Sequence, residues 1–163
     1  MQNRPILFRC SKLGALMTEP KTKSEIMFNL SETCKTYLRE VFINRKYGRY
    51  KDFTSDAIKK GLETEEAALT LFSIQKLRQF NKNEENLTNE FISGTPDSYE
   101  GETIQTATHI IDIKSAWDLF TFHASKEEKV NKDYYWQMQG YMWLTGAIKA
   151  TFCLLYTSDA ADE

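Results

Sequence analysis

Two aspartates and a lysine lie in the stretch from 94 to 114, which reads GTPDSYEGETIQTATHIIDIK. Asp97 follows a proline, and Asp112 and Lys114 are two residues apart in the strand-like run HIIDIK. Because side chains alternate along a strand, Asp112 and Lys114 share one face, and Ile111 and Ile113 take the other. Buried charges are costly unless they are paired or bind a metal. This stretch is therefore a candidate site.

A glutamate lies on the apolar face of a long predicted helix. This helix is expected to begin near residue 54 or 55 and to end near residue 80, with an apolar stripe formed by Ile58, Leu62, Leu69 and Phe72. Glu65 lies on that stripe, whereas Glu63 and Glu66 fall off it and are expected to be solvated. An acid in a core-facing stripe breaks the local pattern, as happens at functional sites. The alternative is a Glu65 at the edge of the stripe that pairs with a lysine.

A glutamine completes the set. The segment Lys132–Gly146 is predicted to be a helix that is apolar nearly all round and therefore buried on most sides. Gln137 lies one turn from both Tyr134 and Tyr141, so its amide is expected to be buried with a hydrogen-bond partner.

These residue types favour metal-assisted hydrolysis of a phosphate ester. Oxygen ligands without paired histidines or cysteines suit Mg²⁺ or Mn²⁺ better than zinc. We expect one or two such ions to be held by Asp97, Asp112 and the backbone carbonyl of Ile113, with Glu65 acting through water. A water on the ion would be the nucleophile, and Lys114 would position it or neutralise charge on the phosphate. Turn-capping and ion-pairing of the two aspartates is the structural alternative. His109, on the isoleucine face, and His123 are not expected to be catalytic.

Several further elements must position this set. Ser11 is expected to cap a short helix that runs to about Met17. Glu90–Gly94 and Thr103–Ser115 are predicted to be adjacent antiparallel strands. Trp117–Ala124 is predicted to be a short helix, and a last strand is expected to begin at Ala150.

Ser31 is expected to cap a strong helix that stops at Gly48. Its core-facing residues are predicted to be Cys34, Tyr37, Leu38, Val41 and Phe42. Its outer face carries cations that could follow phosphates, namely Lys35, Arg39, Arg45 and Lys46.

Length and charge indicate a single domain with an uneven charge distribution. The chain has 163 residues, enough for one sizeable core. Residues 1–60 hold 13 Lys or Arg and 6 Asp or Glu, whereas the remainder holds 8 and 17. A basic half beside an acidic half fits a polyanion-binding surface next to a cation-binding centre. Two solvated faces of opposite charge are the alternative.

Cysteine spacing and hydropathy bear on the compartment. Cys10, Cys34 and Cys153 show neither metal-binding spacing nor a paired framework, which favours a reduced cytoplasmic protein. No apolar run approaches the ~20 residues of a membrane span. The first ten residues lack the apolar core of a signal peptide.

The final segment, CLLYTSDAADE, resembles the translation of a transposon-end adapter used in sequencing libraries. We therefore expect a single domain over residues 1–152, truncated at its C-terminus, followed by a non-native segment over 153–163. A genuine polar tail is the alternative.

The motifs GTPD, DIK and YYWQMQGYM, in this order, resemble the PD-(D/E)XK nuclease superfamily. Within it they resemble the phage lambda exonuclease type, the YqaJ-like viral recombinases. The segment GLETE supplies that family's helix acid at Glu65. Its strand acids fall on Asp97 and Asp112, its lysine on Lys114 and its glutamine on Gln137. The resemblance covers residues 8–152.

The resemblance implies an α/β fold with a small mixed β-sheet flanked by helices, as in restriction endonucleases. Ser11, in FRCSKLGALMT, matches a serine near the family's 5′-phosphate pocket, and Arg4 matches that pocket's arginine by spacing alone. The polar segment Tyr99–Thr108 departs from the family, because it is longer than the tight hairpin common in relatives.

The function implied by the resemblance is that of a metal-dependent deoxyribonuclease, an exonuclease that resects double-stranded DNA ends from 5′ to 3′ in phage recombination. Its partners would be DNA ends, a single-strand annealing protein and two further copies in a homotrimer around DNA. A phage-encoded enzyme would act in the bacterial host cytoplasm. One alternative is a restriction- or repair-type endonuclease on the same core. The other is a catalytically silent DNA-binding module.

Overall fold

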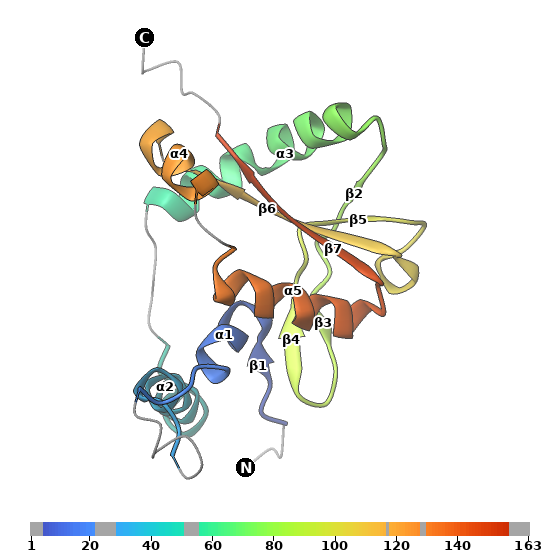
Figure 1. Cartoon of the computed structure of the whole chain (residues 1–163). Helices are drawn as coiled ribbons and strands as arrows, with labels where there is room; N and C mark the ends of the chain where they lie inside the picture. Colours follow the sequence, from blue (N-terminus) through green and yellow to red (C-terminus); the bar gives the residue numbers. More distant parts are fainter. Residues whose placement is uncertain (1–4, 22–28, 51–55, 117, 128–129, 157–163) are drawn as a thin grey trace.

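Strand β6 (His109–Ser115) lies in the middle of the fold, with helix α3 (Asp56–Lys76) on one side and helix α5 (Lys132–Thr145) on the other (Figure 1). The computed structural model describes residues 5–21, 29–50, 56–116, 118–127 and 130–156. β6 is rich in isoleucine, which suits a strand covered on both faces. The mixed α/β class predicted from the sequence is confirmed.

The two faces of β6 belong to two different hydrophobic clusters. Ile110 packs in a cluster with Met138 and Tyr141 of α5. Ile111 and Ile113 pack in a second cluster with side chains of α3. The predicted alternation of faces along β6 is therefore confirmed.

The strands form two small mixed sheets. The four-stranded sheet has the order β2-β5-β6-β7, in which only β6 and β7 are parallel. Its other strands are β2 (Asn81–Lys82), β5 (Ser98–Glu100) and β7 (Lys149–Leu155). The three-stranded sheet has the order β1-β4-β3, formed by β1 (Phe8–Arg9), β4 (Ile92–Gly94) and β3 (Leu87–Thr88).

The predicted pairing of Glu90–Gly94 with Thr103–Ser115 is wrong. β4 lies in the three-stranded sheet, and β5 takes the place beside β6. β5 overlaps the start of the polar segment Tyr99–Thr108, which was noted as longer than the hairpin of relatives. A 3₁₀ turn, η3 (Ile104–Thr106), then buries Ile104 and fills the connection to β6.

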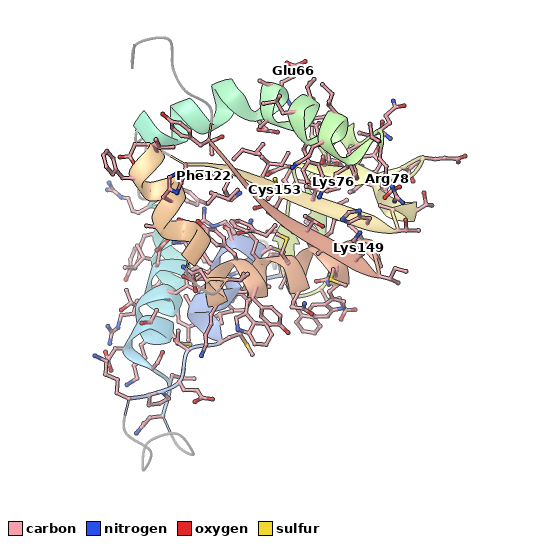
Figure 2. The ribbon with its side chains drawn as sticks, turned by 45° about the horizontal axis from the view of Figure 1, so that its top comes forward. Glu66, Lys76, Arg78, Phe122, Lys149 and Cys153 are labelled. Carbon is pink, nitrogen blue, oxygen red and sulfur yellow. The ribbon has the colours of Figure 1, made fainter. Side chains whose placement is uncertain are left out.

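Helix α3 ends before the position expected from its apolar pattern. Leu77 has a positive φ of 52°, which ends the helix at Lys76. The chain then turns back, so that Phe80 packs on Phe72 with ring centroids 5.1 Å apart. Glu66 is exposed on the outer side of α3, as predicted, and Cys153 of β7 packs beneath the helix (Figure 2).

Helix α5 is fixed at both ends by local signals. Asn131 accepts a hydrogen bond from the backbone N–H of Asp133, and Gly146 ends the helix with a left-handed φ of 75°. The expectation of a helix buried on most sides is wrong, because Tyr135 and Trp143 are 50% and 59% exposed. The covered side of α5 faces the N-terminal segment and strands β4, β6 and β7.

Helix α2 (Glu32–Tyr47) agrees with the sequence at both ends. Ser31 accepts a hydrogen bond from the N–H of Cys34, and Gly48 ends the helix with a φ of 61°. Cys34 and Tyr37 are buried as predicted, but Phe42 is 56% exposed. Phe42 lies at the edge of the predicted stripe, where no neighbouring element covers it among the described residues.

The N-terminal segment and α4 differ from the prediction in detail. Ser11 does not cap a helix: it lies inside the 3₁₀ turn η1 (Cys10–Lys12), which leads into α1 (Leu13–Leu16) without a side-chain cap. Helix α4 (Leu119–Glu127) begins and ends later than expected. No helix in the described part of the chain is long and apolar enough to cross a membrane.

Candidate active site

Hydrogen bonds to the backbone and to the carboxylate of Asp97 fix this residue beside β6. The buried Asn83 donates from Nδ2 to the Pro96 carbonyl at 2.8 Å and from its backbone N–H to the Asp97 carbonyl at 2.9 Å. β5 begins at the next residue and pairs antiparallel with β6. The Asp97 carboxylate then accepts a hydrogen bond from the backbone N–H of Ile113 at 2.7 Å. Asp97 is thus fixed against the strand that carries the other site residues.

Lys114 links the two aspartates. Its Nζ lies 2.7 Å from Asp112 Oδ2 and 3.9 Å from Asp97 Oδ2. The Asp112 side chain is fully buried, whereas that of Lys114 is 34% exposed. The ion-pairing named as the structural alternative is therefore present. It also places an ammonium at the solvent side of two carboxylates, where a phosphate could reach it.

Gln137 reaches Asp112 from α5. Its Nε2 donates to Asp112 Oδ1 at 3.2 Å and to the Tyr141 hydroxyl at 2.9 Å. Gln137 is buried, as the sequence predicted, and the two contacts use both donors of its amide group. The helix therefore fixes the orientation of the buried carboxylate.

Glu65 approaches the same group from α3 and is partly buried. Burial raises the pKa of Glu65, and the negative charge of Asp97 raises it further, while Lys82 and Lys114 oppose the shift. The pKa of Glu65 therefore responds to the charges of Asp97 and Lys114, although Glu65 comes from the helix on the other face of β6.

The charges of Asp112 and Lys114 depend on each other. Burial raises the pKa of Asp112 to about 6, against the lowering influence of Lys114. Burial disfavours the ammonium of Lys114, but the charges of Asp112 and Asp97 outweigh it and raise the pKa of Lys114. Lys114 is therefore charged at neutral pH, and a nearby cation would further favour the ionised form of Asp112.

The oxygen atoms present fit a hard divalent cation. Asp112 Oδ2 is buried, and its close partner in the described part of the chain is Lys114 Nζ at 2.7 Å, so this oxygen keeps lone pairs that a cation could use. Asp97 and the carbonyl of Ile113 would add two further oxygens. Among the described residues, no three Asp, Glu, His or Cys side chains form a metal-binding group by themselves. Water and a phosphate oxygen would therefore fill the remaining positions, as is common for Mg²⁺.

The residues expected at a DNA 5′ end are only partly described. Ser11 is exposed in turn η1, which packs against α5. Arg4 lies outside the described residues.

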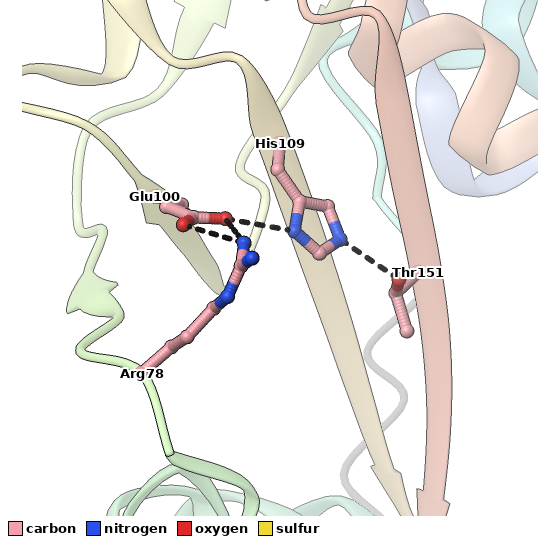
Figure 3. Close-up of polar contacts among 4 residues, drawn as sticks. All are labelled: Arg78, Glu100, His109 and Thr151. Atoms are coloured by element: carbon pink, nitrogen blue, oxygen red, sulfur yellow. Dashed lines mark hydrogen bonds and ion pairs between the residues drawn. The ribbon is translucent and has the colours of Figure 1, made fainter. Parts of the chain in front are cut away.

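His109 forms a network of its own on the α3 side of the sheet (Figure 3). Its Nε2 is 2.8 Å from the Thr151 hydroxyl, and its Nδ1 is 3.3 Å from Glu100 Oε2. Arg78 donates to both oxygens of Glu100, at 2.9 Å and 3.2 Å. This network ties β5, β6 and β7 together and lies on the opposite face of β6 from Asp112.

Asn83 and Tyr141 contact the candidate site residues, although the sequence analysis assigned them no role there. Tyr141 was noted only as a neighbour of Gln137, one turn away. Asn83 lies in a segment that reads as a polar turn, and its role depends on contacts with residues 13 and 14 positions away. Only its burial, which the sequence does not display, would have singled it out.

Comparison with known proteins gives the family. Residues 8–148 match the family described as the YqaJ-like viral recombinase domain. A comparison with curated proteins gives no significant match. A solved structure of a phage-related exonuclease from Haemophilus somnus 129PT is similar, with 30% identity and a TM-score of 0.80 over 98% of this chain and 72% of that chain.

The alkaline exonuclease LHK-Exo from Laribacter hongkongensis has the same fold. Its structure matches at 21% identity and a TM-score of 0.71, over 98% of this chain and 74% of that one. Its complex with dAMP matches at 22% identity and a TM-score of 0.68, over 94% and 70%. With the match over residues 8–148 and this shared exonuclease fold, the chain belongs to the YqaJ-like viral recombinase domain family.

Proposed function

We propose that this protein is a metal-dependent deoxyribonuclease that resects double-stranded DNA ends from 5′ to 3′ in phage-type recombination. The observation that carries the proposal is the position of Lys114 Nζ between Asp112 and Asp97, with Gln137 holding Asp112 in place. The similar proteins are exonucleases, and one of them was solved with dAMP, a nucleotide of the kind that a deoxyribonuclease releases.

Each site residue has a proposed task. Asp97, Asp112 and the Ile113 carbonyl hold one or two Mg²⁺ or Mn²⁺ ions, and Glu65 orients a water beside them. The bound metal supplies a Lewis acid, which lowers the pKa of a water and stabilises charge on the phosphate. Lys114 donates a hydrogen bond to the oxygen on which negative charge grows. Gln137 keeps Asp112 in a single orientation.

The remaining parts of the proposal concern the DNA end and the assembly. Ser11 and Arg4 would hold a terminal 5′ phosphate. The protein would act with a single-strand annealing protein and as a homotrimer that encircles DNA. Light scattering of the purified protein would test the trimer, and an eluting mass of one chain would contradict it.

The test of the activity is digestion of three DNA substrates with Mg²⁺: linear duplex with 5′ phosphates, the same duplex after dephosphorylation, and closed circular duplex. We expect rapid digestion of the first, slower digestion of the second and none of the third. The Ser11→Ala variant should lose most of the preference for 5′ phosphate. Lys114→Ala is the matched inactive control for contaminating nucleases.

Each contrary result has a distinct meaning. Cleavage of the circular duplex would show that the protein is an endonuclease and not an exonuclease. Equal digestion rates on phosphorylated and dephosphorylated ends would contradict the proposal that the protein binds a 5′ phosphate. Binding of DNA without cleavage in either Mg²⁺ or Mn²⁺ would show that the protein is a catalytically silent DNA-binding module.

A further inference from the structure

The outer face of α2 carries cations and an aromatic ring together. Lys35, Arg39, Phe42 and Lys46 recur at spacings of four, three and four residues, so they share one face of the helix. The opposite side of α2 packs against α1 and is buried. In Figure 1, α2 lies apart from the four-stranded sheet, beside α1 and the N-terminal segment.

Aromatic rings at the C-terminal end of α2 are unusually exposed. Phe42, Tyr47 and Tyr50 are 56%, 60% and 75% exposed. Lys46 Nζ lies 5.2 Å from the ring centre of Phe42 and 5.4 Å from that of Tyr47. The Phe42 and Tyr47 rings meet edge to face at 6.3 Å. Grouped exposed rings of this kind mark a contact surface more often than an inert one.

The cations at this end of α2 have no acidic partners among the described residues. Both acids of the helix are engaged elsewhere, one with Lys35 at 2.8 Å and the other with Arg9 at 3.6 Å. Arg45, Lys46 and Arg49 form no ion pair within the described part of the chain. The helix dipole favours cations at a C-terminus. It does not account for exposed rings between them.

We propose that the surface formed by Phe42, Lys46, Tyr47, Arg49 and Tyr50, here called the α2 surface, binds single-stranded DNA. This inference rests on the proposed function, because resection of one strand leaves its complement single-stranded and in need of a binding surface. Unpaired bases stack on aromatic rings while cations contact the phosphates, a combination typical of single-strand binding. In duplex DNA the base faces are stacked on each other, so a duplex would contact this surface through its phosphates and the cations alone.

The test is binding of the parent protein to fluorescent oligo(dT) without divalent metal, measured by anisotropy. Two variants alter the surface: the double substitution Tyr47→Leu with Tyr50→Leu removes stacking but keeps apolar area, and Lys46→Glu reverses a charge. Phe91→Leu is the matched control, because Phe91 is 55% exposed on the β3–β4 connection. We expect oligo(dT) affinity to fall about tenfold or more in the tyrosine variant, since each stacked base contributes ~1–3 kcal/mol. Affinity should also fall in Lys46→Glu, because the reversed charge repels the phosphates. The control should bind like the parent.

A blunt duplex of the same length separates the alternatives. The tyrosine variant should bind this duplex nearly as well as the parent does. Unchanged oligo(dT) binding in the α2 variants would overturn the proposal, and so would an equal loss on oligo(dT) and duplex in the tyrosine variant. Binding of the α2 surface to phosphatidylserine vesicles without binding to oligo(dT) would also overturn it.

Digestion of linear duplex by the same preparations distinguishes this proposal from the proposed function. If the parent digests nothing but binds oligo(dT) through the α2 surface, the nuclease proposal fails and the single-strand surface stands. If the parent digests duplex and the α2 variants bind oligo(dT) like the parent, the reverse holds.

Discussion

Lys114 is the side chain on which the proposed chemistry depends most directly, because it is the cation nearest to both aspartates. We expect Lys114→Ala and Asp112→Asn to lower the rate of DNA cleavage at least about 100-fold, the loss typical for removal of one charge-stabilising group. DNA binding should remain measurable, since contacts with the phosphates elsewhere are kept. Gel-based digestion and anisotropy would measure the two effects separately.

The control for these variants is Lys76→Ala, an exposed lysine at the C-terminal end of α3 (Figure 2). It should cleave at the parent rate. A parent-like rate of DNA cleavage in either site variant would contradict the assignment of Asp112 and Lys114 to the active site.

Metal binding should be visible without any reaction. Mg²⁺ at 100 times its dissociation constant would stabilise the folded state by about 2.7 kcal/mol, so it should raise the melting temperature of the parent. Asp112→Asn should lose most of this increase, because a neutral amide is a poorer ligand for a hard cation. Glu66→Gln, an exposed change on α3, is the control (Figure 2). An equal increase in the parent and in Asp112→Asn would contradict the metal assignment.

At the scale of elements, the network around His109 joins β7 to the rest of its sheet. Burial lowers the pKa of His109, although Glu100 opposes this. The unfolded chain therefore takes up a proton at a higher pH than the folded chain, and the stabilising contribution of neutral His109 is lost as pH falls from 6.5 through its folded pKa. His109 therefore lowers the unfolding free energy of the parent as pH falls over this range, while Asp112, whose folded pKa is raised to about 6, acts in the opposite direction.

In the His109→Gln variant the unfolding free energy should fall less than in the parent as pH is lowered over the same range, measured by denaturant titration. His123→Gln, at an exposed position on α4, is the matched control and should keep the parent slope. If the unfolding free energy of His109→Gln depends on pH as that of the parent does, His109 is not the cause of the effect.

The contact between α5 and the N-terminal segment depends on a glycine. A Cβ at Gly140 would lie 2.5 Å from Leu13 Cδ1 and 2.9 Å from Cys10 Sγ. Alanine favours a helix by up to ~1 kcal/mol over glycine, but overpacking typically costs ~1–3 kcal/mol. We therefore expect Gly140→Ala to destabilise the protein in denaturant titrations. Gln139→Ala, at the exposed neighbouring position, should not, and a Gly140→Ala variant as stable as the parent would contradict the close packing.

For the whole molecule, the formal charge of −2 conceals a basic N-terminal part. DNA binding would use that part, which holds 13 Lys or Arg against 6 Asp or Glu over residues 1–60. If about three phosphates are neutralised, affinity should fall more than tenfold between roughly 50 and 200 mM salt. Anisotropy at several salt concentrations would measure the slope, and an affinity independent of salt would exclude a phosphate-contacting surface.

The sequence by itself determined the features that depend on neighbouring residues. The strand alternation placed Asp112 and Lys114 on one face of β6, and the pattern around α2 gave its cap at Ser31 and its stop at Gly48. These are short-range effects of backbone geometry and hydrogen bonding, so they can be read from a few consecutive residues.

Only the tertiary structure decided which elements meet. It placed β5 beside β6, which sets Asp97 against Ile113, and it left Trp143 of α5 exposed where a buried helix was expected. It also brought Asn83 to the Pro96–Asp97 segment. Pairing between distant strands and the covering of a helix face depend on contacts far apart in the chain, which local periodicity does not encode.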